Sequence, residues 1–275
     1  MGLRGKSTSD ALDRTTEERT GVADSVAIGG AVAAFPRERL LRLAELEDWH
    51  FWFVSRRLLV ERLLDRHLGA GKRALLDLGC GTGSLVRRLA ALGHCAIGVD
   101  ARPEGLDSAS ASSPGARFIR ASADRLPLSD GAFDGILLLD ILEHVDDGRL
   151  IAEARRVLRP NGLLIASVPA MPWLWSYRDV AAGHLRRYTW TTITKLLEGA
   201  GFTLRETRNF QCLLFPLVAA ARVAGRKGVR ARDLEERPNR LINSAFAWLN
   251  RLEVRLGDRI PWPWGSSLVA VGVKS

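Results

Sequence analysis

Cysteine is scarce in this sequence of 275 residues. The three cysteines, Cys80, Cys95 and Cys212, are dispersed and form no C-x-x-C pair. An odd, scattered set of this kind argues against a disulfide framework and against a cysteine-based zinc site. The sequence therefore predicts no resident metal.

Long hydrophobic runs are also absent. No stretch approaches the roughly 20 uninterrupted apolar residues that cross a bilayer, and the N-terminal residues lack the basic region and compact apolar run of a secretory signal. We therefore expect a cytoplasmic protein without an integral membrane span. Residues 1–35 mix small, polar and charged residues without a sustained period, which predicts a disordered or loosely packed leader.

Acidic residues are outnumbered by basic ones, 31 to 40, which gives a net charge of +9. Such an excess can attract nucleic acid, anionic lipid or a phosphorylated substrate. However, no stripe of basic residues is interleaved with aromatic ones, as a nucleic-acid surface would show. We therefore attribute the net positive charge to a general bias of the sequence towards arginine and do not expect a nucleic-acid partner.

From residue 73 onward, short apolar runs alternate with helical patterns. This alternation is typical of an α/β protein with a Rossmann-like, mostly parallel sheet and helices on both faces. We expect a helical insertion over about 211–265 before the last strand, and an N-terminal helical lid over residues 36–72. The seven expected strands are 73–78, 96–100, 117–120, 133–140, 163–168, 202–210 and 267–274.

A glycine-rich loop, D-L-G-C-G-T-G at 77–83, follows the first expected strand. Glycines let the backbone turn sharply and approach a ligand at the carboxyl end of the sheet. Asp100, at the end of the second strand, can accept hydrogen bonds from two ribose hydroxyls. The third glycine comes one residue earlier than in the dinucleotide fingerprint. S-adenosylmethionine (SAM), which has no pyrophosphate, therefore fits this loop better than a dinucleotide.

Several segments, in order, resemble the motifs of class I SAM-dependent methyltransferases, in the subgroup that includes ubiquinone and menaquinone methyltransferases. They are Leu75–Gly83, Gly98–Asp100, Ala121–Leu128 with Phe133–Asp134, Asp140–Val145 and Leu158–Leu163.

The resemblance implies the roles of the donor-binding residues. Asp77, Gly79, Cys80 and Gly81 would line the methionine moiety. Asp100 with Ala101 would take the ribose, and Ser122 with Ala123 would border the adenine. Ser122 departs from the family pattern, because many members have an aspartate there; a serine can accept a hydrogen bond but carries no charge.

The methyl acceptor should lie over segments that follow the fourth and fifth strands. Asp140 and His144 are candidate bases, although Glu143 and His144 can equally begin a helix. His184 is the strongest candidate base. The predicted substrate wall consists of Trp173, Trp175 and Tyr177, with Arg187 and Tyr188 beside His184; packing and surface ion pairs are the alternative.

Two further segments are candidates for covering the site. The aromatic stretch at 49–57 can place Trp52 or Phe53 near a sulfonium and Arg56 or Arg57 near the methionine carboxylate. A helix that packs on the sheet explains the same pattern and is slightly favoured. Residues 210–224 suit either a membrane interface or, as we favour, a buried lid helix.

The leading hypothesis is an enzyme that methylates oxygen, nitrogen or carbon of a small or medium-sized biosynthetic intermediate with apolar and anionic parts. One alternative is an isoprenoid or lipid-linked acceptor reached by peripheral membrane contact. The alternative from another class is a SAM-binding module without catalysis. Nucleic-acid methylation is disfavoured, because D-I-L-E at 140–143 replaces an N-P-P-Y motif. The oligomeric state stays open.

Overall fold

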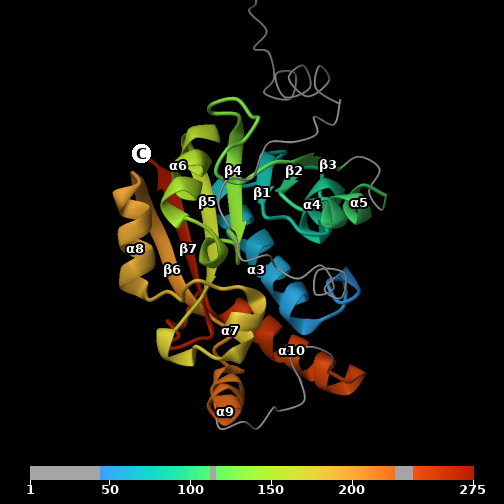
Figure 1. The fold of residues 1–275 in the computed structure, drawn as a ribbon, viewed down its shortest axis with the longest axis vertical. Helices are drawn as coiled ribbons and strands as arrows, with labels where there is room; N and C mark the ends of the chain where they lie inside the picture. Colours follow the sequence, from blue (N-terminus) through green and yellow to red (C-terminus); the bar gives the residue numbers. More distant parts are fainter. Residues whose placement is uncertain (1–43, 112–115, 227–237) are drawn as a thin grey trace, which may run out of the picture.

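The computed structural model describes residues 44–111, 116–226 and 238–275. The expected leader at 1–35 lies outside these residues. In the described chain, the strands form one seven-stranded sheet in the order β3-β2-β1-β4-β5-β7-β6 (Figure 1). The strands are β1 (Ala74–Leu78), β2 (Cys95–Asp100), β3 (Arg117–Arg120), β4 (Phe133–Leu139), β5 (Leu158–Pro169), β6 (Phe202–Phe210) and β7 (Ser267–Lys274).

The pairing of the strands confirms the predicted α/β Rossmann-like fold. The neighbours from β3 to β5 run parallel, whereas β7 is antiparallel to both β5 and β6. The fourth strand ends at Leu139, one residue earlier than expected, because Asp140 turns into the left-handed region with φ of 55°.

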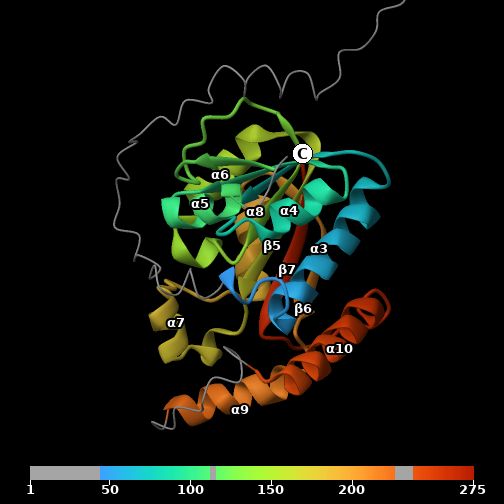
Figure 2. The same ribbon diagram turned by 90° about the vertical axis from the view of Figure 1, so that its right-hand side faces the viewer.

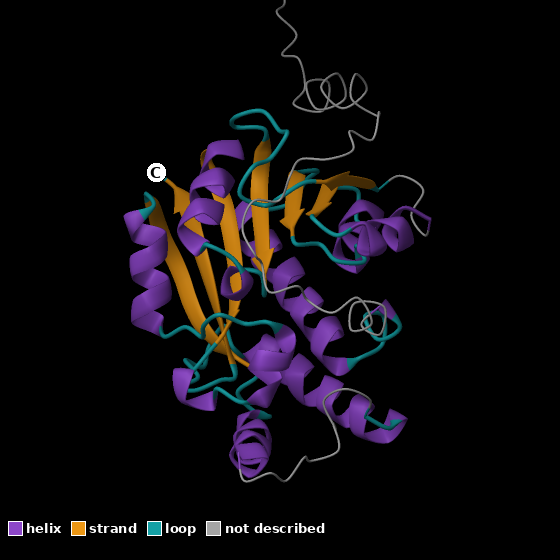
Figure 3. Cartoon of the chain, in the orientation of Figure 1, coloured by secondary structure: helices purple, strands orange, loops and turns teal. Residues whose placement is uncertain are grey.

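Helices cover both faces of the sheet, so the central strands β1 and β4 are buried along their whole length and mostly apolar rather than alternating (Figure 3). Residues of α6 (Asp147–Val157) and α8 (Trp190–Gly199) pack on one face. Residues of α3 (Phe51–Leu68), α4 (Ser84–Ala91) and α5 (Pro103–Ala111) pack on the other. The core therefore consists of two apolar layers separated by the sheet.

Helix α3 packs on the sheet through its second half. Leu59, Leu63 and Leu64 are buried in the same apolar cluster as Leu75 and Leu137 of the sheet. The amphipathic pattern of the sequence thus has a packing explanation. The first half of α3 extends past the strands towards their carboxyl ends (Figure 1).

The insertion between β6 and β7 contains α9 (Phe215–Arg226) and α10 (Arg240–Leu256). Figure 2 shows α9 beyond the carboxyl ends of the parallel strands, at the same end of the molecule as the short helix α7 (Tyr177–Ala182), whereas α10 lies alongside α3. Among the described residues, no helix has both the length and the hydropathy needed to cross a bilayer.

The insertion is fastened to α3 by Asn243, a residue of α10 that is 8% exposed. Its Oδ1 accepts the backbone N–H of Phe51 at 2.8 Å, and its Nδ2 donates to the carbonyl of Trp49 at 2.9 Å. One side chain therefore satisfies two backbone groups at the start of a helix that lies almost 200 positions earlier in the sequence.

We predict that Asn243→Ala lowers the free energy of unfolding by about 1–3 kcal/mol, because it leaves both backbone groups without their partner. Urea denaturation measures the change. Ser244→Ala, at the exposed neighbouring position, is the control and should stay within about 0.5 kcal/mol of the wild type. Equal effects of the two substitutions would contradict this role of Asn243.

Candidate functional site

The turn between β1 and α4 uses its glycines in conformations that other residues rarely adopt. Gly79, Gly81 and Gly83 have φ values of 76°, 56° and 75°. The backbone N–H groups of Gly79 and Cys80 both donate to the carbonyl of Val99, at 2.8 and 3.1 Å. These bonds hold the turn against the end of β2.

Two of these glycines also lie so close to neighbouring residues that a side chain at either position would clash. A Cβ atom on Gly79 would lie 2.7 Å from Cδ1 of Ile141, and one on Gly83 would lie 2.5 Å from Cε1 of Phe118. Small residues are therefore required by space as well as by backbone conformation.

Asp100 lies against this turn and is 4% exposed. Its Oδ2 accepts the N–H of Gly81 at 3.0 Å, and its Oδ1 accepts the N–H of Arg102 at 2.9 Å. Its Oδ1 also accepts from Nε of Arg102 at 3.3 Å. A carboxylate accepts about four hydrogen bonds, so Oδ2 keeps capacity for a ligand hydroxyl. The half-buried Ala101 follows directly.

Asp77, under the turn, is buried beside other acidic groups. Burial raises the pKa of its carboxyl to about 7; Arg56 opposes this shift, whereas Glu47 and Asp100 add to it. Glu47 accepts a hydrogen bond from the Thr82 hydroxyl, which ties the segment before α3 to the glycine turn. The sequence analysis missed Glu47, because nothing in its local pattern distinguishes it from a surface glutamate.

Ser122 and Ala123 are half-buried after β3. The Ser122 hydroxyl donates to Asp124, two residues along the chain. A carboxylate therefore stands beside the serine that replaces the usual aspartate. The sequence analysis did not consider this substitute, although it lies within the same motif.

Cys80 is buried in the turn, and burial raises the pKa of its thiol well above its ordinary value. Its Sγ would lie 2.7 Å from a Cβ atom on Gly98. Cys80 therefore packs the turn against β2 and is not poised to act as a thiolate nucleophile.

Two arginines of α3 contact residues that follow the carboxyl ends of β1 and β4. Arg56 forms an ion pair with Asp140, and Nη1 of Arg57 donates to Ser84 Oγ at 3.2 Å. Asp140 also accepts the Ser167 hydroxyl at 3.1 Å. The carboxylate of Asp140 thus joins α3, β4 and β5 and is already engaged on both oxygens.

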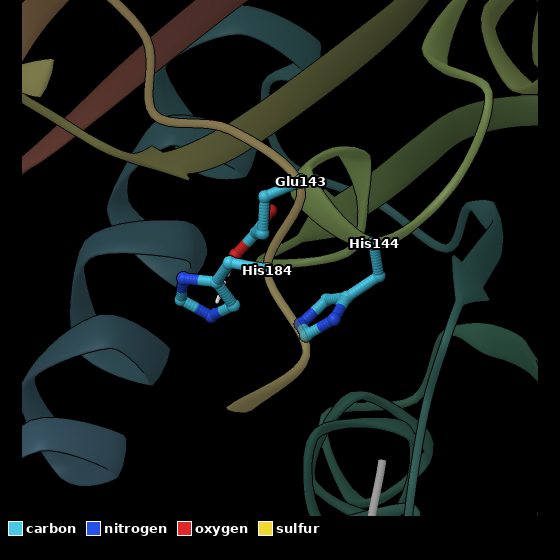
Figure 4. A group of neighbouring side chains, drawn as sticks. All are labelled: Glu143, His144 and His184. Carbon is cyan, nitrogen blue, oxygen red and sulfur yellow. Dashed lines mark ion pairs between the residues drawn. The ribbon is translucent and has the colours of Figure 1, made fainter. Parts of the chain in front are cut away.

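His144 and His184 lie side by side, although they come from separate segments. Their rings are perpendicular, with centroids 4.8 Å apart. The backbone N–H of Leu185 donates to the carbonyl of Glu143 at 2.7 Å, which brings the two segments together (Figure 4). Burial, followed by the charge of His184, lowers the pKa of His144 to about 4, so this imidazole is neutral at neutral pH.

Asp179 orients His184 and was missed by the sequence analysis. It is fully buried, and its Oδ1 lies 3.0 Å from His184 Nδ1 and 2.7 Å from Arg187 Nε. Its Oδ2 accepts from Arg222 of α9 at 3.2 Å. Burial would raise the pKa of Asp179, but its bonds to His184 and Arg187 outweigh burial and lower that pKa.

Arg187 and Tyr188 lie in the interior and not on an open substrate surface. The side chain of Arg187 is 4% exposed and donates to Asp179 and to the carbonyl of Ala170. Tyr188 is 3% exposed, and its hydroxyl lies 2.8 Å from Asp147 Oδ2. Their placement gives no support to the expected contact with substrate, because both polar groups already have partners within the protein.

The predicted aromatic wall is distributed along η2 (Pro172–Leu174) and the start of α7. Trp173 and Tyr177 are exposed, and Trp175 is half-buried. The ring of Trp173 stands edge-on to Phe215 of α9, with centroids 6.0 Å apart. The wall and the insertion are thus parts of one surface beyond the carboxyl ends of the strands.

Comparison with known proteins agrees with this geometry. Residues 76–166 match the family model described as "Methyltransferase domain". The chain is 34% identical to an uncharacterized methyltransferase of Mycobacterium bovis, over 59% of this chain and 57% of that protein. It is 30% identical to a probable S-adenosylmethionine-dependent methyltransferase of Mycolicibacterium smegmatis, over 59% of this chain and 63% of that protein.

Each of these matches spans less than two thirds of the relative's own length. Among solved structures, the [4+2]-cyclase SpnF superposes with a TM-score of 0.54 and 20% identity, over 79% of this chain and 80% of that chain. A likeness at that identity shows the fold alone. Residues 76–166 thus resemble a methyltransferase domain in sequence, and the described chain has the corresponding fold.

We predict that Gly83→Ala costs about 2–4 kcal/mol of unfolding free energy, because it combines left-handed strain with displacement of the Phe118 ring. Gly93→Ala is the matched control, since Gly93 has φ of 89° but nothing within 4 Å of an added Cβ. Thermal unfolding should show a loss of only about 1–2 kcal/mol for the control. Equal losses would mean that close packing of the turn contributes nothing.

Proposed function

We propose that this protein is a SAM-dependent methyltransferase acting on a small or medium-sized organic acceptor. The observation that carries the proposal is the pairing of the glycine turn with Asp100, across the adjacent carboxyl ends of β1 and β2. This pairing lies inside the segment that matches the methyltransferase family. The bacterial relatives with SAM dependence in their names support the same donor.

In this proposal, the donor lies across the turn. Asp77, Gly79, Cys80 and Gly81 line its methionine part. Asp100 and Ala101 hold the ribose hydroxyls. The adenine lies at Ser122 and Ala123, where Asp124 supplies the carboxylate that Ser122 lacks.

The acceptor would bind where η1 (Leu142–His144), η2, α7 and α9 meet. Methyl transfer from a sulfonium is an in-line displacement, so the main task of the protein is to align the accepting atom with the S–CH3 bond. Trp173, Trp175 and Tyr177 offer apolar contact area there. His184 and His144 are the nearest candidates for promoting loss of a proton from the acceptor. Likeness to the ubiquinone and menaquinone subgroup would make an aromatic ring a suitable acceptor.

We predict that Asp100→Ala weakens SAM binding at least about tenfold, because charge-assisted hydrogen bonds to a ligand contribute roughly 1.5–3 kcal/mol. Calorimetric titration of the purified protein measures it. Asp107→Ala, at an exposed position of α5, should bind SAM as the wild type does. Unchanged affinity of Asp100→Ala would refute the proposed donor site.

Enzymatic turnover separates this proposal from a SAM-binding module without catalysis. The wild-type protein should form S-adenosylhomocysteine when SAM is supplied with a panel of hydroxylated and amino aromatic acids, and Asp100→Ala should form much less. Donor binding without product from any acceptor of the panel would favour the non-catalytic module.

A lipid-linked acceptor is the second candidate, because the insertion exposes large apolar side chains. Leu241 and Trp248 of α10 are 84% and 62% exposed, and Leu217 of α9 is 46% exposed. Exposed apolar residues next to arginines suit a membrane interface. Leu214, by contrast, is buried, so it belongs to the packing of the insertion.

We predict for this second candidate that the protein sediments with vesicles containing 30% phosphatidylglycerol, and that Leu241→Asp combined with Trp248→Asp abolishes sedimentation without lowering the melting temperature. Failure of the wild-type protein to sediment would leave only the water-soluble acceptor.

A further inference from the structure

Three potential metal ligands gather beside the proposed acceptor position. Glu143, His144 and His184 each offer one donor atom, and these atoms lie within 4.8 Å of one another. Figure 4 shows Glu143 and His144 on one ribbon segment and His184 on another that passes alongside it. Segments separated by about 40 positions therefore supply one cluster.

Glu143 has a carboxylate oxygen that the rest of the described chain leaves without a partner. The residue is 1% exposed, and its Oε2 has no hydrogen-bond partner among the described residues. Its Oε1 lies 4.0 Å from His184 Nε2, which is beyond a hydrogen bond. A buried carboxylate oxygen in this situation needs a donor or a cation, since leaving it bare is costly.

His184 is held in the orientation that a metal ligand requires. Its Nδ1 is bonded to the fully buried Asp179, so Nε2 is the nitrogen that faces Glu143. A carboxylate on the far nitrogen of a ligating histidine fixes its ring and tautomer. The imidazole of His144 is also held, by a hydrogen bond with the backbone of Gly183.

We propose that Glu143, His144 and His184 bind a divalent cation of the Zn²⁺ type, with an open coordination position for an oxygen atom of the acceptor. Two imidazoles and one carboxylate are the ligand set of catalytic zinc sites that keep such a position. Mg²⁺ prefers oxygen ligands and fits this set poorly. Ligand atoms around one tetrahedral zinc lie about 3.4 Å apart, so side-chain movements on the order of 1 Å would close the site.

The position of the cluster connects it to the proposed methyl transfer, on which this part of the inference rests. Glu143 and His144 follow β4, which pairs with β1, and Ile141 lies against Gly79 of the donor turn. A hydroxyl bound to the cation would lose its proton to solvent more readily. Its oxygen would then bond to the methyl carbon while the C–S bond breaks, and sulfur would keep the electron pair as S-adenosylhomocysteine leaves. His184 would serve as a ligand rather than as a base.

Cobalt(II) is a direct probe, because its visible absorption reports coordination by protein ligands. We expect the full-length, chelator-treated protein to bind one Co²⁺ per chain with a visible spectrum that Zn²⁺ abolishes. Glu143→Gln and His184→Ala should each weaken binding at least about 100-fold, since each removes one of three ligands. His94→Ala is the control, because His94 precedes β2 at the opposite end of the sheet; it should bind Co²⁺ normally.

Asp179→Asn tests the support of His184 and should weaken Co²⁺ binding about 10–100-fold. Zn²⁺ should raise the melting temperature of the wild type but not that of Glu143→Gln, and a cooperative melting transition of the metal-free variant near that of the metal-free wild type excludes a loss caused by misfolding. Absence of a visible Co²⁺ spectrum in the wild type, or equal binding by Glu143→Gln, would overturn the metal site. SAM titration of the same wild-type sample separates the proposed donor site from the proposed metal site. A protein that binds Co²⁺ but not SAM would refute the donor site alone.

Discussion

The close packing of the turn after β1 is the constraint on which the rest of the site depends. Its glycines take left-handed conformations, and the space around two of them is filled by Ile141 and Phe118. Those side chains belong to the segments after β4 and in β3. The turn therefore fixes the spacing of the neighbouring strand ends, and a larger residue in it would move groups that belong to the other parts of the site.

The region at the carboxyl ends of the strands, next to this turn, is built from segments that lie far apart in the sequence. Arg56 of α3 pairs with Asp140 after β4, and Asn243 of α10 holds the start of α3. Arg222 of α9 in turn contacts Asp179 of α7. The insertion is thereby linked both to α3, whose Arg57 contacts Ser84 after the glycine turn, and to the residue that orients His184. Changes in the insertion should consequently act on the geometry of the site and not only on an outer surface.

The sheet and the glycine-rich turn after β1 could be predicted from the sequence because their signals are local. A buried parallel strand is a short apolar run, and a G-x-G-x-G turn is recognisable within seven residues. Helix α7 gave no such periodic signal, since it has only six residues; its one local mark was the Ser176–Asp179 capping box. The roles of Arg187 and Tyr188 could not be read locally either, because their partners Asp179 and Asp147 become neighbours only in the folded chain. An arginine beside aromatic residues looks the same in sequence whether it faces a substrate or a buried aspartate.

Two buried carboxylates flank His184, and they differ in how their charge is compensated. The carboxylate of Asp179 is hydrogen-bonded to Arg187, to Arg222 and to Nδ1 of His184. An ionised Asp179 can only accept, so a hydrogen bond with His184 requires the ring proton on Nδ1. The lone pair of Nε2 then faces Glu143, whose own oxygens are also acceptors when ionised. These two acceptors are 4.0 Å apart, too far to share a proton in a hydrogen bond, and burial leaves them costly without a partner. A cation between them would supply that partner and would be the Lewis-acid centre proposed above. In that proposal the acceptor would be activated by Glu143, His144 and His184 acting together, with His184 held in place by Asp179, and not by an isolated histidine.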